Sequence, residues 1–384
     1  ARLGTLAAAV HEVIEKRTAL HDVHLAAGAR LDRSGGWLRP FAYGDWHDEY
    51  RAVRERVSVM DVGTLGKFLI AGREAPALVD RLFPCTTRDL APGRSRYVLA
   101  LDEAGYVLDD GLLCALDDGA FYLTSTSGRA ARMDGRLREW ADLLDLHVHV
   151  LDRTAELAAI NVAGPNAREL LERLSDDALD ADAFPYPGHR EVVVAGVPCR
   201  AIRTGFVGEL AFELHHPRSR GPELWGALMS EGRPFGIVPH GLDALELLRL
   251  EKGHVYLGQD TMPDDTPAKL GMPWAVDMGK PWFVGKLALE RIASLPQTRR
   301  LVGLEFDDAP AGAAGLRGAP LTAEGAVVGR VTSAERSGVL ERAIGLGWIR
   351  SADGGFPTDL RVGRRVARVV PTPFYDPEGV RIRG

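Results

Sequence analysis

The sequence predicts an α+β protein with more than one domain, and three observations support this prediction. A chain of 384 residues is too long for one ordinary hydrophobic core, so two or three domains are expected. Two segments each have the pattern of an apolar strand, a glycine turn and a short helix. From about Thr298 onward, short β runs are separated by glycine, proline and aspartate, which is typical of an all-β barrel or sandwich.

The composition restricts the class of protein. The apolar fraction of 46% and the charged fraction of 26% are those of a soluble globular protein. A net charge of −6 argues against a nucleic-acid partner, which would need a basic face. No apolar stretch approaches the roughly 20 residues of a membrane span. Residues 1–12 predict an amphipathic helix that is charged too early for a secretory signal. A cytoplasmic protein without a membrane partner is therefore expected.

The two strand–turn–helix segments resemble each other. In the first, an apolar strand over 68–73 leads into a helical pattern over 74–83. In the second, a strand over 159–165 leads into a helical pattern over 166–174. Each helix has a proline or a polar residue near its start. The similarity suggests two related α+β units, although strand–glycine–helix is a common unit and coincidence is the alternative.

The other elements follow from local patterns. Residues 97–126 predict three short strands joined by glycine-containing turns. A helix is expected from Gly241 to Lys252, and residues 262–273 predict a long loop of the kind that is often functional. The β runs of the C-terminal part are 301–305, 327–333, 344–349 and 366–370.

Several polar patterns predict no metal or redox site. Cys85, Cys114 and Cys199 fit no metal or disulfide spacing and are expected to be buried free thiols. His147 and His149 alternate on one strand but have no third ligand nearby in sequence. No Gly-x-Gly-x-x-Gly follows a strand, so neither a flavin nor a nicotinamide site is expected in this chain.

The most informative segment is 203–213, Arg-Thr-Gly-Phe-Val-Gly-Glu-Leu-Ala-Phe-Glu. Its glycines allow a tight turn or the close approach of a ligand. A carboxylate beside such a turn offers two acceptors to a ligand edge that carries two donors, as the 2-amino group and N3–H of a pterin do. The alternative is a β-hairpin with a surface glutamate.

This segment resembles the Arg-Thr-Gly-Tyr-Thr-Gly-Glu-x-Gly-Phe-Glu motif of the folate-dependent aminomethyltransferases, the glycine-cleavage T-protein family. Further motifs follow in the family's order over nearly the whole chain. They are residues 18–24, 35–40, 60–67, 97–110, 248–253, 258–261, 283–286 and 373–379.

The resemblance implies three domains arranged in a ring around a central hole that holds tetrahydrofolate. Residues 1–66 together with 150–260 would form a discontinuous folate-binding α+β domain, with 67–149 as an inserted α+β domain. Residues 261–297 would be a linker and loop, and 298–384 a C-terminal β-barrel.

The same resemblance implies the residues that bind folate. Glu213 matches the carboxylate that binds the pterin. Tyr97 and Tyr186 match aromatic positions that line the folate site. Phe206 matches a position that is often tyrosine, so a hydrogen bond made by that hydroxyl would be missing here.

Arg249 and Asp110 match two further positions. Arg249 lies in the matching Arg-Leu-Glu helix and is expected to serve folate, with an intrahelical ion pair to Glu246 as an equal alternative. Asp110 matches the central catalytic acid, which can stabilise a cationic amine or relay a proton. Since adjacent residues of a strand point to opposite faces, Asp109 and Asp110 are not expected to act as a dyad.

The implied function is the transfer of a methyl or methylene unit from a small methylated or aminomethyl donor to N5 of tetrahydrofolate. The product would be 5-methyl- or 5,10-methylene-tetrahydrofolate. Residues 61–65 depart from the Asp-Val-Ser-His-Met of glycine-cleavage T-proteins, and residues 258–261 have the Gly-Gln-Asp-Thr form. Both departures are more similar to the folate domains of sarcosine oxidase α-subunits and dimethylglycine oxidase, and to folate-dependent demethylases.

Two alternatives stay open. The chain could be the folate-binding subunit of a heteromeric sarcosine oxidase-like enzyme with a flavoprotein partner, because oxidation of an N-methyl group needs a hydride acceptor. It could also be a non-catalytic folate-binding protein, like the family's iron–sulfur-assembly branch. His254 in place of that branch's cysteine, and the presence of Asp110, favour an enzyme.

Overall fold

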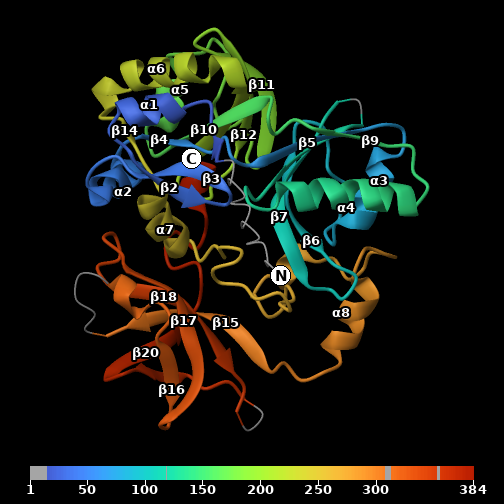
Figure 1. Ribbon diagram of the computed structural model, residues 1–384, viewed down its shortest axis with the longest axis vertical. Coiled ribbons are helices and arrows are strands. Elements are labelled where there is room, and N and C mark those ends of the chain that lie inside the picture. The colour runs from blue at the N-terminus through green and yellow to red at the C-terminus, as the bar shows by residue number, and fades with distance from the viewer. Residues whose placement is uncertain (1–14, 118, 308–312, 353–354) are drawn as a thin grey trace, which may run out of the picture.

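The computed structural model describes residues 15–117, 119–307, 313–352 and 355–384. The helix expected over 1–12 lies outside them. Figure 1 shows two mixed lobes in the upper half of the view and a β-rich C-terminal lobe below, with the chain that follows α7 (Leu242–Glu251) running between them. The expected α+β fold is confirmed.

The first lobe is built on a six-stranded sheet in the order β11-β12-β13-β10-β4-β14. Neighbouring strands are antiparallel, except that β14 and β4 are parallel. The strands are β4 (Ser58–Asp61), β10 (Leu157–Ala163), β11 (Gly188–Val194), β12 (Val197–Arg203), β13 (Ala211–Pro217) and β14 (Val238–Pro239). Apolar side chains of α5 (Ala167–Glu172) and α6 (Gly221–Glu231) cover one face of this sheet.

The N-terminal part of the described chain packs beside this sheet. A three-stranded sheet contains β1 (Lys16–Arg17), β3 (Trp37–Ala42) and β2 (Arg30–Ser34) in that order. It is accompanied by α1 (His21–Ala26) and α2 (Trp46–Glu55). Asp45 caps α2 by accepting a hydrogen bond from the His47 backbone N–H, which satisfies a donor that the first helical turn leaves free.

The second lobe is a five-stranded antiparallel sheet in the order β6-β7-β8-β5-β9. Its strands are β5 (Gly66–Ala71), β6 (Ser95–Leu101), β7 (Val107–Ala115), β8 (Phe121–Ser125) and β9 (His149–Asp152). The helices α3 (Ala75–Leu82) and α4 (Ala130–Leu143) cover one face with an apolar core. The three strands expected over 97–126 are confirmed as β6, β7 and β8.

The two strand–turn–helix segments share an unusual turn. Gly72, between β5 and α3, and Gly164, between β10 and α5, both have φ of +123°. A Cβ at either glycine would lie 2.6 Å from a backbone carbonyl oxygen, that of His147 or of Arg56. Both positions therefore require glycine, and this shared geometry supports the suggestion that the two units are related.

The C-terminal lobe is a closed barrel in the order β15-β18-β17-β16-β19-β20, and pairing of β20 with β15 closes it. The structure thus decides between barrel and sandwich. The strands are β15 (Arg299–Phe306), β16 (Pro320–Ala323), β17 (Ala326–Arg336), β18 (Ala343–Arg350), β19 (Asp359–Val362) and β20 (Arg365–Val370). The sequence patterns missed the short strands β16 and β19. Between α7 and the barrel lie a long irregular segment and α8 (Lys286–Ala293), and the chain ends in α9 (Val380–Arg383).

Candidate functional site

Asp110 is a partly buried carboxylate held by two hydroxyl groups. It lies on β7, where its Oδ2 accepts a hydrogen bond of 2.8 Å from the Tyr97 hydroxyl of β6. Its Oδ1 accepts one of 3.0 Å from the hydroxyl of Thr126, which directly follows β8. Burial raises the pKa of Asp110 and outweighs the lowering effect of these hydrogen bonds. The carboxyl group is therefore fixed in orientation and takes up a proton more readily than an ordinary aspartate.

Asp109 faces the other side of the same sheet. Asp110 pairs with Leu99, which packs against α7 and the barrel, whereas Asp109 pairs with Ala100, in the core beneath α3 and α4. The two carboxylates therefore lie on opposite faces, as the alternation of a strand predicts. Neither oxygen of Asp109 has a hydrogen-bond partner. Burial, followed by the charge of Asp110, raises the pKa of Asp109 to about 7.

This pKa predicts a specific effect of Asp109→Asn on stability. An aspartate in an unfolded chain has a pKa of about 4. The stability that Asp109 contributes is therefore full below about pH 4 and is lost as the pH rises toward 7. Asparagine cannot ionise, so the variant is expected to be more stable than the wild type at pH 8, by on the order of 1–2 kcal/mol. Thermal unfolding at pH 4.5 and pH 8 checks this prediction, and a variant that loses stability equally at both values would contradict it.

Glu213 lies on β13 and faces the space between the two sheets. Its Oε2 lies 3.3 Å from Nε2 of His215, whose Nδ1 lies 2.9 Å from the Tyr122 hydroxyl of β8. An ionised glutamate only accepts, so Nε2 donates to it, and the hydroxyl donates to Nδ1 of the neutral ring. Burial lowers the pKa of His215, which favours this neutral form. Glu213 keeps most of its acceptor capacity for another partner.

Asp110 and Glu213 face the same space between the sheets. On β7, Asp110, Leu112 and Cys114 share a face because side chains alternate along a strand. Cys114 and Leu112 pack with Ile202, which is the strand neighbour of Glu213. In the described part of the chain, no hydrogen bond joins the two carboxylates directly.

Phe206 lies in the turn that precedes β13. Its ring stacks on that of His254 with centroids 5.1 Å apart, and its carbonyl oxygen accepts a hydrogen bond of 2.9 Å from His254 Nδ1. Just over a third of Phe206 is exposed. The turn is thereby attached to the segment that follows α7.

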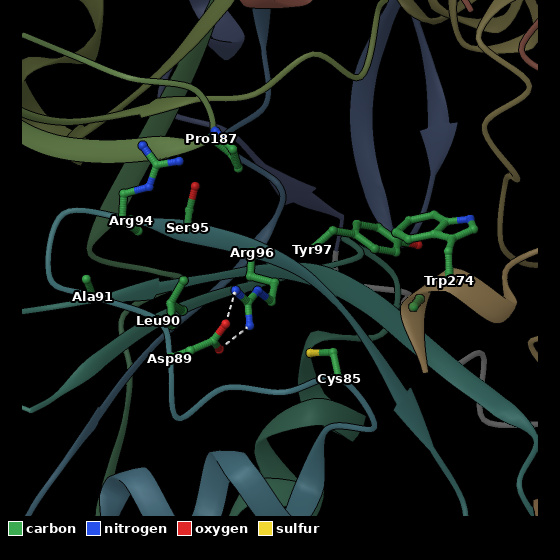
Figure 2. Close-up of a pocket in the computed structure, with 11 residues that line it drawn as sticks. Cys85, Asp89, Leu90, Ala91, Arg94, Ser95, Arg96, Tyr97, Pro187 and Trp274 are labelled. Carbon is green, nitrogen blue, oxygen red and sulfur yellow. Dashed lines mark hydrogen bonds and ion pairs between the residues drawn. The ribbon is translucent and has the colours of Figure 1, made fainter. Parts of the chain in front are cut away.

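Tyr97 also forms one wall of a groove of about 390 Å³, shown in Figure 2. Trp274 lies against Tyr97 with ring centroids 5.5 Å apart, and more than two thirds of this tryptophan is exposed. Arg94 lies at the other end, and Arg96 pairs with Asp89, which also lines the groove (Figure 2). The groove begins beside the Tyr97–Asp110 pair and leads away from it.

Tyr186 borders the same region. Its carbonyl oxygen accepts a hydrogen bond of 3.2 Å from Arg94, and the next residue, Pro187, lines the groove. The guanidinium of Arg203 lies 6.0 Å from the centre of the Tyr186 ring, a cation–π arrangement. Tyr97 lies on β6, whereas Tyr186 lies in the loop that precedes β11.

Arg249 lies in a buried network that links α7 to the barrel. Its guanidinium donates to Glu246, to Asp260 at 2.6 Å and to Ser333 at 2.7 Å. The ion pair with Glu246 that the sequence offered as an alternative is present. A folate contact of Arg249 stays a prediction, and the network gives this residue a structural connection in addition.

Sequence patterns missed several residues that shape this region. Thr126 follows a strand, and no pattern marked it as functional. Trp274 follows the long loop predicted over 262–273, and that loop was the only functional signal. His215 is one of two adjacent histidines, and the structure joins it to Glu213. Within the described residues, no cluster of three or more metal-ligating side chains is present, and no helix is both long and apolar enough to cross a membrane. The cysteines are free and buried, as expected.

Two family models match the chain. The model described as "GCVT N-terminal domain" matches residues 20–280. The model described as "Glycine cleavage T-protein C-terminal barrel domain" matches residues 299–376, which contain the barrel strands.

Individual relatives agree with these models. The aminomethyltransferase of Symbiobacterium thermophilum is 35% identical over 94% of this chain and 97% of its own length. Sarcosine oxidase subunit alpha of Corynebacterium sp. strain U-96 is 34% identical over 96% of this chain, a match that covers 40% of that longer protein. The crystal structure of glycine cleavage system aminomethyltransferase T from Bartonella henselae superposes with a TM-score of 0.82. It is 25% identical and covers 94% of this chain and 98% of that chain.

Proposed function

Because this chain belongs to the folate-dependent aminomethyltransferase family, that of the glycine-cleavage T-proteins, we propose that it is a tetrahydrofolate-dependent one-carbon transferase. It would move a methyl or methylene unit from a small methylated or aminomethyl donor to N5 of tetrahydrofolate. The resemblance drawn from the sequence motifs is confirmed at the level of the family.

One observation carries this proposal. Asp110, a carboxylate fixed by Tyr97 and Thr126, and Glu213, a carboxylate with spare acceptor capacity, face the same space between two sheets. A buried carboxylate needs donors, and the 2-amino group and N3–H of the pterin would supply two. The Glu213 site therefore fits the ligand by its chemistry.

The proposed chemistry assigns a separate task to each group. Glu213 would orient the pterin. The rings of Tyr97, Tyr186 and Phe206 would surround it, and Arg249 would contact the folate. Holding the acceptor nitrogen close to the donor is an orientation effect and can supply a large part of catalysis. Asp110 would stabilise positive charge on the amine and take or return a proton at the reacting nitrogens.

The products distinguish the two forms of transfer. A methyl group can move to N5 without net oxidation, whereas conversion of an N-methyl donor to the methylene level removes a hydride and needs an acceptor. The experiment incubates the protein anaerobically with tetrahydrofolate and a panel of N-, O- and S-methyl and aminomethyl donors. Mass spectrometry then identifies 5-methyl- or 5,10-methylene-tetrahydrofolate. A protein that binds tetrahydrofolate but forms neither product with any donor would contradict the transferase proposal.

The match to sarcosine oxidase subunit alpha favours a second candidate. In it, the chain is the folate-binding subunit of a heteromeric flavoenzyme and receives an imine made by a flavoprotein partner. Affinity purification from the native cell with flavin detection tests this candidate. A flavoprotein at equal stoichiometry that is required for product formation would replace the self-contained transferase, and activity of the isolated chain would exclude the requirement.

A further inference from the structure

Asn161 and Glu213 are neighbours on adjacent strands of the six-stranded sheet. In the antiparallel register of β10 and β13, Asn161 lies directly opposite Glu213. Directly opposite residues point to the same face with Cβ atoms about 4.5–5.5 Å apart. Met60 on β4 continues the row beyond Asn161, and Ile202 on β12 continues it beyond Glu213. A polar pair is thus bounded on both sides by buried apolar residues.

The amide oxygen of Asn161 has no partner. Asn161 is only 7% exposed, and its Oδ1 is buried without a hydrogen bond. A buried polar atom that is unsatisfied weakens the folded state, and nearly all such atoms in proteins are paired. An orphaned acceptor beside Glu213 is therefore a second observation, independent of any sequence motif, that indicates a ligand at this position.

The chemistry of the pair identifies the part of the ligand that it would bind. The carboxylate and the amide present a row of three acceptor oxygens, of which only Glu213 Oε2 has a protein contact, with His215. The edge of a pterin carries three hydrogens in the same order: N3–H and the two hydrogens of the 2-amino group. A carboxylate accepts two of them side by side, which leaves the outer hydrogen of the 2-amino group without an acceptor.

We propose that Asn161 Oδ1 accepts this outer hydrogen, so that Asn161 is a ligand-binding residue that selects for a 2-amino group. This inference rests on the proposed function and deepens it. A site that hydrogen-bonds a ligand group discriminates strongly against an analogue without that group, because its own polar atoms then stay unpaired. The Asn161–Glu213 row would therefore reject pteridines without the amino group more strongly than Glu213 alone.

The experiment is a cycle of two proteins and two ligands. Wild type and Asn161→Leu, in which two methyl groups replace the amide oxygen and nitrogen, are titrated by calorimetry without oxygen. The ligands are 6-methyltetrahydropterin and its 2-desamino analogue. We expect the variant to bind 6-methyltetrahydropterin about tenfold more weakly and the 2-desamino analogue as the wild type does. Asn166→Leu applies the same change at the N-terminus of α5, on the other side of Gly164, and should alter neither affinity.

Thermal stability separates this role from a structural one. Removal of an unpaired buried amide should raise the Tm of the ligand-free variant, whereas loss of a structural contact would lower it. Asn161→Ala removes the same oxygen. It replaces Asn161→Leu in the two titrations if the leucine variant does not fold. Equal affinity of Asn161→Leu and wild type for 6-methyltetrahydropterin overturns the inference while the proposed function stands. Failure of the wild type to bind either 6-methyltetrahydropterin or tetrahydrofolate overturns both.

Discussion

Replacement of Asp110 by asparagine is expected to lower the turnover of one-carbon transfer to tetrahydrofolate by about 10²–10⁴-fold. The carboxylate is fixed by Tyr97 and Thr126, and asparagine fits the same space without a charge or an exchangeable acid proton. Binding of tetrahydrofolate should change little, because the pterin edge is assigned to Glu213. Single-turnover kinetics with a donor from the screen above, together with a calorimetric Kd, measure the two effects separately.

Asp109→Asn is a matched control for this prediction. It makes the same chemical change at the adjacent position, on the face covered by α3 and α4. Its turnover is expected to lie within about threefold of the wild type, because the substitution changes the surroundings of the reacting groups and none of their contacts. If both variants lost turnover equally, the assignment of catalysis to the Asp110 face would be wrong.

The pH dependence gives a second, independent prediction for Asp110. If the ionised carboxylate takes the proton, turnover falls as the pH drops through its pKa, which burial has raised. The hydrogen bond from Thr126 lowers that pKa. Thr126→Val should therefore move the acidic limb of the pH–rate profile to higher pH, by up to about one unit for the loss of one hydrogen bond. A limb that stays in place in Thr126→Val would assign it to another group.

The sequence predicted those parts of the fold that depend on local patterns. Strand alternation and glycine turns located β6, β7 and β8, and β runs separated by glycine and proline located most of the barrel. Local patterns left barrel and sandwich open, because the pairing of β20 with β15 joins residues more than 60 positions apart, and only the family resemblance implied the barrel that the structure confirms. Four-residue strands such as β16 and β19 contain too few side chains to show an alternation.

In the candidate site, too, local patterns were predictable from the sequence and long-range contacts were not. The two-residue period of a strand correctly separated Asp109 from Asp110. The contact of Tyr122 with His215 spans 93 positions, and the register that places Asn161 opposite Glu213 comes from strand pairing. No local pattern contains such information. Arg249 is intermediate: its i,i+3 partner Glu246 follows from helix geometry, whereas Asp260 and Ser333 depend on the packing of the barrel against α7.

Replacement of Glu213 by glutamine or alanine is expected to weaken the binding of tetrahydrofolate by about 30-fold to a thousand-fold, or roughly 2–4 kcal/mol. Alanine removes both acceptors and leaves two pterin donors buried without partners. Glutamine keeps the shape of the side chain but turns one acceptor into a donor that faces another donor. Anaerobic calorimetric titration of each variant measures the loss.

The pair of substitutions also decides what the carboxylate does. If Glu213 served only to fill space between the sheets, glutamine would restore binding, because its volume is nearly the same. If its acceptors bind the pterin edge, glutamine and alanine should fail to similar degrees, while Glu191→Gln, at an exposed carboxylate on β11, should bind as the wild type does. Tight binding by Glu213→Gln would therefore contradict the placement of the pterin at Glu213, and the proposed role of Asn161 as well. Loss in both variants, with an unchanged Tm, would support the placement of the pterin edge on the polar pair between the two sheets.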